Sequence, residues 1–129
     1  MNVVDSSAWL EYFADGPNAG AFARSIESPA TLLVPTLSLF EVFKRVCQQV
    51  GEEEGLKKIA LMEQGRVVEL DRATALEAAR LSLHHGIAMA DSVMLATARR
   101  YKATLWTQDA DLQAWKTCGT SRGRERRKD

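Results

Sequence analysis

The sequence has few of the residues on which secreted scaffolds, zinc sites and membrane anchors depend. Its 129 residues include two cysteines and two histidines, and Cys47 and Cys118 form no CxxC or Cys/His zinc spacing. This pattern indicates two reduced thiols in a cytoplasmic protein, because disulfides persist mainly in oxidising compartments. No apolar run approaches the roughly 20 residues of a membrane span, and the first residues lack the pattern of a signal peptide. We therefore expect a cytoplasmic protein with no membrane association.

An excess of charge of one sign is also missing, since 17 basic residues balance 17 acidic ones. The charges are unevenly spread, however: residues 119–129 hold five basic and two acidic residues and show no apolar periodicity. The length and composition are those of one ordinary globular domain. We therefore predict a single domain over residues 1–118, followed by a basic, disordered tail over residues 119–129.

Short apolar segments alternate with longer segments of helical periodicity. The predicted strands are residues 2–5, 31–35, 66–70 and 103–107. The predicted helices are residues 6–16, 18–28, 38–51, 52–65, 72–86 and 90–101. Continuous apolar strands that alternate with helices indicate a parallel sheet covered on both faces, so the predicted fold class is α/β.

Carboxylates lie where the predicted strands end and the predicted helices begin. Asp5 ends the first strand, Asp109 lies two residues after the last, and Glu41 is near the start of the helix after the second. Asp91 shares the apolar face of the helix that leads to the last strand, and a buried carboxylate requires a cation or hydrogen bonds. Ligands of open parallel sheets bind beyond the carboxyl ends of the strands. Taken together, the four acids favour a site for Mg²⁺ or Mn²⁺, which take oxygen ligands.

Each acid also has a simpler structural interpretation. Aspartate is a favoured N-cap residue, which would account for Asp5, Asp91 and Asp109 one by one. Ser38 and Glu41 form a complete S-x-x-E capping box, which would account for Glu41. Four such caps at corresponding ends of α/β units would be a coincidence, so we favour the cation site for the set.

Four motifs carry a resemblance to a known family: "VVDSSAWLEYF", "SLFEVF", "GIAMADSVMLATAR" and "LWTQDADL", in this order. Over about residues 1–115, the chain resembles the PIN-domain nucleases, most closely the VapC-type toxins of toxin–antitoxin pairs. The resemblance implies a three-layer α/β/α sandwich with a mostly parallel central sheet of four or five strands. Such toxins usually end with a short apolar strand, and "AWKTCGTSRGRERRKD" contains no convincing candidate for it. The sequence is therefore compatible with a sheet of four strands and with one that has an irregular fifth strand at its edge.

The resemblance also implies a site and an activity. Asp5, Glu41, Asp91 and Asp109 fall on the acidic positions of the family. The first, third and fourth would hold Mg²⁺, for which Mn²⁺ can substitute, and Glu41 would bind metal or activate water. The accessory residues would be Ser6, Thr107 and Asp111. The implied function is a toxin that hydrolyses RNA phosphodiester bonds as a homodimer and is inhibited by a cognate VapB-type antitoxin.

Two other functions fit parts of the sequence. A phosphoreceiver domain would use Asp5 for metal, Asp71 as phosphoacceptor and Thr107 as switch hydroxyl. Receivers carry paired acids near the first strand and a lysine after a fifth strand, and this sequence has neither; we expect Asp71 to be a helix cap. The other alternative is a catalytically silent PIN-like binding module, against which the four acids argue.

Several residues near these acids admit two interpretations. Lys44 and Arg45 can approach a substrate phosphate, although a solvated helix face is the simpler interpretation. Trp9, Tyr12 and Phe13 recur at helical spacing, which favours a core or dimer contact over a platform for stacked bases.

Overall fold

The central element of the fold is a five-stranded parallel sheet. The computed structural model describes residues 1–113 and 120–122, and of these the side chains of residues 111, 113 and 120–122 are not described. The strands are β1 (Asn2–Val4), β2 (Leu32–Pro35), β3 (Arg66–Val68), β4 (Thr104–Thr107) and β5 (Thr120–Arg122). Their order is β3-β2-β1-β4-β5, and every neighbouring pair is parallel.

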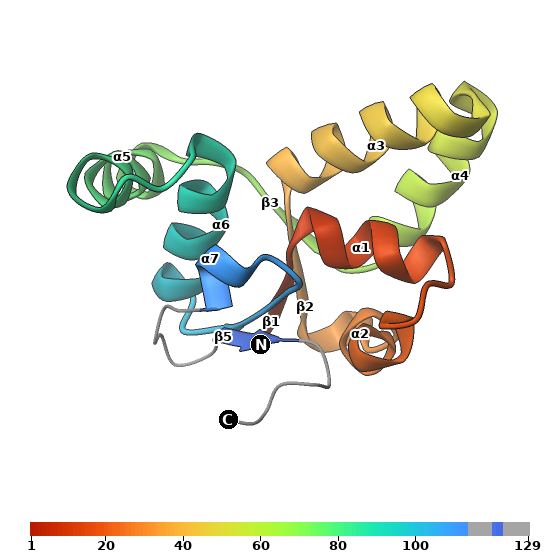
Figure 1. The fold of residues 1–129 in the computed structure, drawn as a ribbon, viewed down its shortest axis with the longest axis horizontal. Helices are drawn as coiled ribbons and strands as arrows, with labels where there is room; N and C mark the ends of the chain where they lie inside the picture. The colour runs from red at the N-terminus through yellow and green to blue at the C-terminus, as the bar shows by residue number, and fades with distance from the viewer. Residues whose placement is uncertain (114–119, 123–129) are drawn as a thin grey trace.

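Helices cover both faces of this sheet, which completes the three predicted layers (Figure 1). One face carries α1 (Ser6–Phe13), α2 (Ala19–Ile26), α3 (Thr36–Val50) and α4 (Glu52–Met62). The other face carries α5 (Arg72–His85), α6 (Met89–Arg100) and α7 (Ala110–Gln113). A 3-10 turn, η1 (Pro29–Thr31), leads into β2. Among the described residues, no helix is both long and apolar enough to cross a membrane. The predicted α/β class and sandwich architecture are therefore confirmed.

Two hydrophobic cores form because successive residues of a strand point to opposite faces of the sheet. Val3 of β1 packs in the core beneath α5 and α6, whereas the next residue, Val4, packs beneath the helices of the opposite layer. Trp9 is fully buried in that second core and stacks on Phe13, with ring centroids 5.5 Å apart. Burial on both faces explains why the strands are continuously apolar in sequence, and Trp9 is a core residue.

The predicted strands and helices occur where expected, with bounds shifted by a few residues, but the end of the domain differs. Residues Thr120–Arg122 form β5 and pair with β4, with Leu105 opposite Thr120. The prediction of a disordered tail from residue 119 is therefore wrong for these three residues. An edge strand is held by backbone hydrogen bonds to its neighbour, and these need no apolar side-chain pattern. Residues 123–129 of the predicted tail lie outside the described residues.

The start of α3 also differs from the prediction. This helix begins at Thr36, two residues before Ser38, so Ser38 is not at the N-cap position. Instead, the hydroxyl of the buried Ser38 donates a hydrogen bond of 3.6 Å to the sulfur of Met94, which lies in α6. The capping-box interpretation of Ser38 and Glu41 is therefore wrong, and the position of Glu41 needs another explanation.

Candidate functional site

The four predicted acids meet at the carboxyl ends of the two central strands. Asp5 follows β1 and Asp109 follows β4, and these strands are neighbours in the sheet. Glu41 comes from α3 and Asp91 from α6, and both line with Asp5 a cleft of about 420 Å³. Helices from opposite layers thus place carboxylates around the same point, as the sequence analysis expected.

Hydroxyl groups hold Asp5 in place. Asp5 is only 5% exposed, and its Oδ2 accepts hydrogen bonds from Thr107 Oγ1 at 2.9 Å and Ser7 Oγ at 3.1 Å. The backbone N–H of Asp109 donates to the same Thr107 oxygen at 2.9 Å. Burial raises the pKa of Asp5 above its usual range, while the hydroxyl hydrogen bonds lower it. Although Asp5 precedes α1, its side chain makes no capping bond within the described residues, so a helix cap does not explain it.

Glu41 is held by the residue next to Asp5. The Ser6 hydroxyl donates a hydrogen bond of 2.6 Å to Glu41 Oε1 and thereby joins the first turn of α1 to α3. Ser6 is 7% exposed, so this bond is largely protected from water. A short hydrogen bond from a buried hydroxyl fixes the carboxylate toward the acid cluster, which accounts for Glu41 without a cap.

The pKa of Asp91 is raised by its burial and by the other three acids. Burial, followed by a hydrogen bond with the Asp109 carboxyl group, raises the pKa of Asp91 to about 7. The negative charges of Asp109, Asp5 and Glu41 add to the shift. The N-cap of α6 is Ala88, so Asp91 lies inside the first turn and is not the cap. Asp91 and Asp109 therefore share a proton at pH values below about 7, and a bound cation would favour the loss of that proton.

Basic and polar residues of α3 form one rim of the cleft. Lys44, Arg45 and Gln48 line it together with Glu41. They lie three, four and seven residues after Glu41 and so share its helix face. The solvated-face interpretation of Lys44 and Arg45 is thus incomplete, since both are exposed yet border the acids. The sequence analysis did not identify Gln48 as a residue of the cleft, although a spacing of seven residues places it on the same helix face as Glu41.

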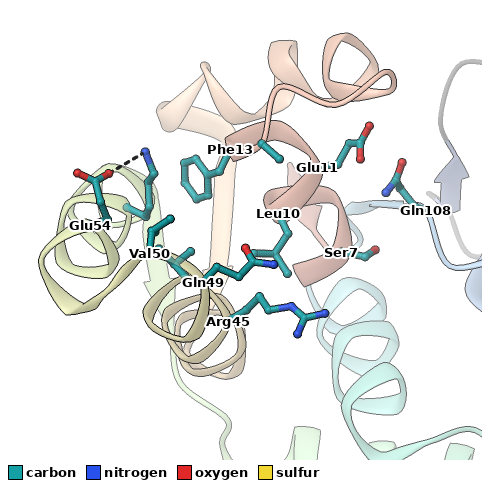
Figure 2. Close-up of a pocket in the computed structure, with 12 residues that line it drawn as sticks. Ser7, Leu10, Glu11, Phe13, Arg45, Gln49, Val50, Glu54 and Gln108 are labelled. Carbon is teal, nitrogen blue, oxygen red and sulfur yellow. Dashed lines mark ion pairs between the residues drawn. The ribbon is translucent and has the colours of Figure 1, made fainter.

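A second groove, between α1 and α3–α4, adjoins the cleft (Figure 2). It measures about 700 Å³ and shares Ser7, Leu10 and Arg45 with the cleft. Gln108, which follows β4, lines the side nearest the sheet and accepts a 2.8 Å hydrogen bond from Asn18. No local pattern of residues marks this groove, because its walls come from segments that are distant along the chain.

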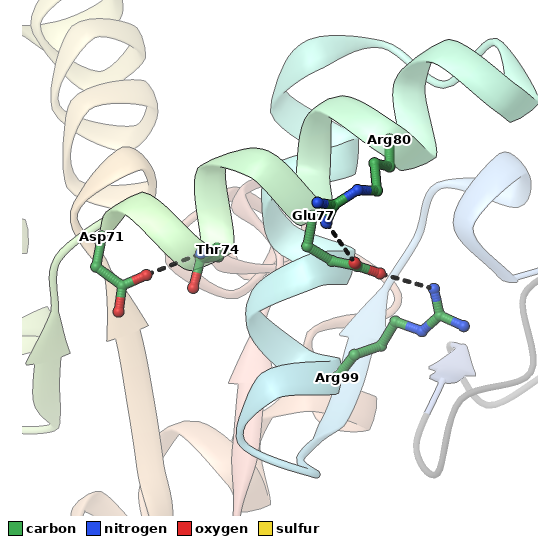
Figure 3. Close-up of polar contacts among 5 residues, drawn as sticks. All are labelled: Asp71, Thr74, Glu77, Arg80 and Arg99. Atoms are coloured by element: carbon green, nitrogen blue, oxygen red, sulfur yellow. Dashed lines mark hydrogen bonds and ion pairs between the residues drawn. The ribbon is translucent and has the colours of Figure 1, made fainter.

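Asp71 lies away from these acids, after the edge strand β3 (Figure 3). Its carboxylate accepts a 2.8 Å hydrogen bond from the backbone N–H of Thr74 and caps α5. Nearby, Glu77 forms ion pairs with Arg80 and Arg99. Because β2 separates β3 from β1, Asp71 is not beside Asp5 as a phosphoreceiver requires. The predicted helix cap is confirmed, and the receiver arrangement is contradicted.

The last predicted accessory residue, Asp111, lies in α7 after β4. Its side chain is not among those described, so its accessory role stays a prediction.

The donor chemistry of the cluster fits a hard divalent cation. All four side chains offer carboxylate oxygens, which Mg²⁺ and Mn²⁺ prefer, and the raised pKa of Asp91 marks a point where added positive charge is favourable. Within residues 1–113 and 120–122, no three His, Cys, Asp or Glu side chains already form a complete ligand set. The Asp and Glu side chains would therefore have to rotate to place their oxygens on one ion.

The comparison with known proteins agrees with this geometry. The sequence matches the PIN domain family over residues 3–116. The chain belongs to the PIN domain family. No curated protein matches the sequence of this PIN domain, and its relatives are found among solved structures.

Three of these structures illustrate how far the fold is shared. VapC20 of Mycobacterium tuberculosis, described as a toxin that cleaves the sarcin–ricin loop, is 17% identical, with a TM-score of 0.74 over 88% of this chain and 94% of that one. VapBC2 of Rickettsia felis, bound to promoter DNA, is 12% identical, with a TM-score of 0.74 over 95% and 98%. PAE2754 of Pyrobaculum aerophilum is 22% identical, with a TM-score of 0.70 over 95% and 90%. At these identities the likeness establishes a common fold.

The pKa of Asp91 predicts how stability depends on pH. Because its folded-state value of about 7 lies above the ordinary 3.8, the folded protein keeps a proton that the unfolded chain releases. We expect the free energy of unfolding in EDTA to fall through this group as the pH rises between these two values. Asp91→Asn, which does not titrate, should remove that decline, whereas the exposed Asp15→Asn should retain it. Urea titrations across this pH range measure the difference, and equal slopes in the two variants would contradict the assignment.

The cap on α5 gives a second prediction. Asp71→Ala should lower the urea midpoint of unfolding, because the N–H of Thr74 loses its acceptor, and Asp71→Ser should restore most of the loss.

The absence of receiver activity can be tested with a small phosphodonor. Treatment of the wild type with acetyl phosphate should leave its mass unchanged. A phosphoryl adduct on Asp71 would instead support the assignment of the protein as a phosphoreceiver domain.

Proposed function

We propose that this PIN domain is a divalent-cation-dependent endoribonuclease that hydrolyses RNA phosphodiester bonds as the toxin of a type II toxin–antitoxin pair. The observation that carries the proposal is the convergence of Asp5, Glu41, Asp91 and Asp109, with a pKa of about 7 at Asp91. The similar folds of VapC20, described as a toxin that cleaves the sarcin–ricin loop, and of several toxin–antitoxin complexes support it.

In this function, Asp5, Asp91 and Asp109 would hold Mg²⁺ or Mn²⁺. The ion, when bound, neutralises charge on the phosphodiester and lowers the pKa of a water molecule. Thr107 fixes the carboxylate of Asp5 through its hydrogen bond, and so keeps one ligand in position.

Glu41 would accept the proton of the attacking water. The hydrogen bond from Ser6 would hold the carboxylate of Glu41 in place during this transfer. Attack of this water on phosphorus would form a new P–O bond and break the bond between phosphorus and the 3′ oxygen, which leaves with the bonding electron pair and takes a proton from solvent. The products are a 5′-phosphate and a 3′-hydroxyl.

The proposed partner is a VapB-type antitoxin that blocks the acidic cleft. A guanidinium group from such a partner can bridge two carboxylates in a bidentate manner. It would occupy the space that the cation and the phosphodiester need.

We also propose that the protein forms a homodimer in the cytoplasm. Leu83 of α5 and Met89 of α6 are 79% and 73% exposed and offer apolar surface for the contact between the two copies.

Metal dependence is the direct test of the nuclease. The purified chain should cleave a long single-stranded RNA in Mg²⁺ or Mn²⁺, and EDTA should abolish cleavage. Asp91→Asn should abolish it as well, and Thr107→Val should reduce the rate about ten- to hundredfold, since it frees Asp5 to move. Asp15→Asn serves as the matched control and should cleave like the wild type. Cleavage that persists in EDTA would exclude the metal mechanism, and no cleavage with any divalent ion would favour the binding module.

Co-expression with the protein encoded next to it tests the toxin assignment. The two proteins should co-purify, and the complex should cleave RNA only after the partner is removed. Light scattering on the complex would give the number of copies of each chain. A complex that cleaves as fast as the isolated PIN domain would mean that the neighbour is not an inhibitor.

A further inference from the structure

We infer that the groove between α1 and α3–α4 holds the RNA nucleotide next to the scissile phosphate, and that Arg45 binds the phosphate of that nucleotide. This inference rests on the proposed nuclease function and names a substrate subsite within it. It assigns Arg45 a positioning role and the groove a role in choosing the base.

The groove lies next to the acidic cleft. Ser7, Leu10 and Arg45, which Figure 2 shows in the groove, also line the cleft, so the two spaces share one boundary. At about 700 Å³ the groove is larger than the cleft and within the range of small-molecule sites. A strand of RNA whose phosphate sits at the acids would therefore enter the groove with its next nucleotide.

The charges along this path suit a phosphate at Arg45. Within the described part of the chain, the carboxylates that line the groove are engaged: Glu11 accepts the N–H of Asn18 at 2.6 Å, and Glu54 pairs with Lys58 at 3.7 Å. Arg45 has no ion pair or hydrogen bond among the described residues. A guanidinium group binds phosphate through two parallel hydrogen bonds. Arg45 is thus a cation shared by the groove and the cleft that can offset the repulsion between RNA and the four acids.

The lining of the groove suits a nucleobase, which has apolar faces and polar edges. Leu10, Val46 and Val50 provide apolar surface, and the amides of Gln49 and Gln108 lie along the sides. Aliphatic side chains can cover the face of a base, and amides can bind its edges. This combination differs from the cleft beside it, in which three of the acids line the wall.

Charge also decides between RNA and a basic protein segment as the occupant of the groove. The partner guanidinium proposed above enters the acidic cleft, where three carboxylates outweigh the charges of Lys44 and Arg45. In the groove, Arg45 would meet like charge on a basic segment and complementary charge on RNA. We therefore favour RNA in the groove.

RNA binding by the non-cleaving Asp91→Asn chain tests the phosphate contact. The probe is a fluorescein-labelled, short single-stranded RNA of mixed sequence, followed by anisotropy over a series of salt concentrations. Arg45→Ala should weaken binding and reduce the slope of log Kd against log salt by about 0.7, the value for one phosphate on a single strand. Arg24→Ala, which removes an exposed arginine of α2 outside the groove, should leave the slope unchanged.

A groove-filling substitution tests the base contact. Val50 is 63% exposed, so Val50→Trp should fold normally while it occupies the groove. We expect it to weaken RNA binding about tenfold and, in the active chain, to change the base preference beside the cut. Leu56→Trp, at a residue 56% exposed on α4 outside the groove, is the matched control and should do neither.

The outcomes separate the two proposals. If Arg45→Ala and Val50→Trp bind RNA as tightly as their controls, the inferred subsite is wrong. Loss of co-purification with the neighbouring protein in Val50→Trp, with RNA binding intact, would show that a protein segment fills the groove. If the wild type never cleaves RNA but both variants lose binding, the nuclease proposal fails while the groove remains an RNA site. A loss in Arg45→Ala alone would support the phosphate contact and overturn the base contact.

Discussion

The pairing of β1 with β4 at the centre of the sheet is the constraint on which the candidate site depends. These strands lie about a hundred residues apart in the chain, yet Val4 lies opposite Trp106, and the N–H of Asp5 donates to the Trp106 carbonyl at 2.9 Å. This register places the Asp5 carboxylate beside the Thr107 hydroxyl, which in turn receives the N–H of Asp109. A shift of one residue would turn these side chains to the opposite faces of the sheet.

Around this pairing, the fold brings together groups that repel one another. Burial raises the pKa values of Asp91 and Asp5 most, and the charges of neighbouring carboxylates raise both further. Buried hydroxyls offset part of the repulsion by donating hydrogen bonds to Asp5 and Glu41. Clustered carboxylates lower the free energy of unfolding, and a bound cation would supply the positive charge that offsets their repulsion. Functional sites often reduce the stability of a protein in this way.

Most of the fold and the acid cluster could be predicted from the sequence, because both leave local patterns. Apolar runs that alternate with helical periodicity indicated the strands, and strand-end positions indicated Asp5 and Asp109. A local pattern can mislead where a tertiary contact competes with it. Ser38 and Glu41 match a capping box, yet the helix begins earlier and Glu41 is held by Ser6 instead.

Other features leave no local trace at all. β5 is defined by its backbone pairing to β4, and its sequence, Thr-Ser-Arg, has no apolar pattern. The groove beside the cleft is built from α1, α3, α4 and Gln108, so only the assembled fold creates it.

The hydrogen bond between Thr107 and Asp5 also bears on how the protein is made. A nascent chain emerges from the ribosome with its N-terminus first, so Asp5 leaves long before Thr107 and Asp109. Contacts between such distant residues form only after the intervening chain has closed a large loop. The four acids therefore cannot assemble before the segment that holds Thr107 and Asp109 has been made and has left the ribosome. A growing polypeptide that still lacks this segment carries no formed acid cluster.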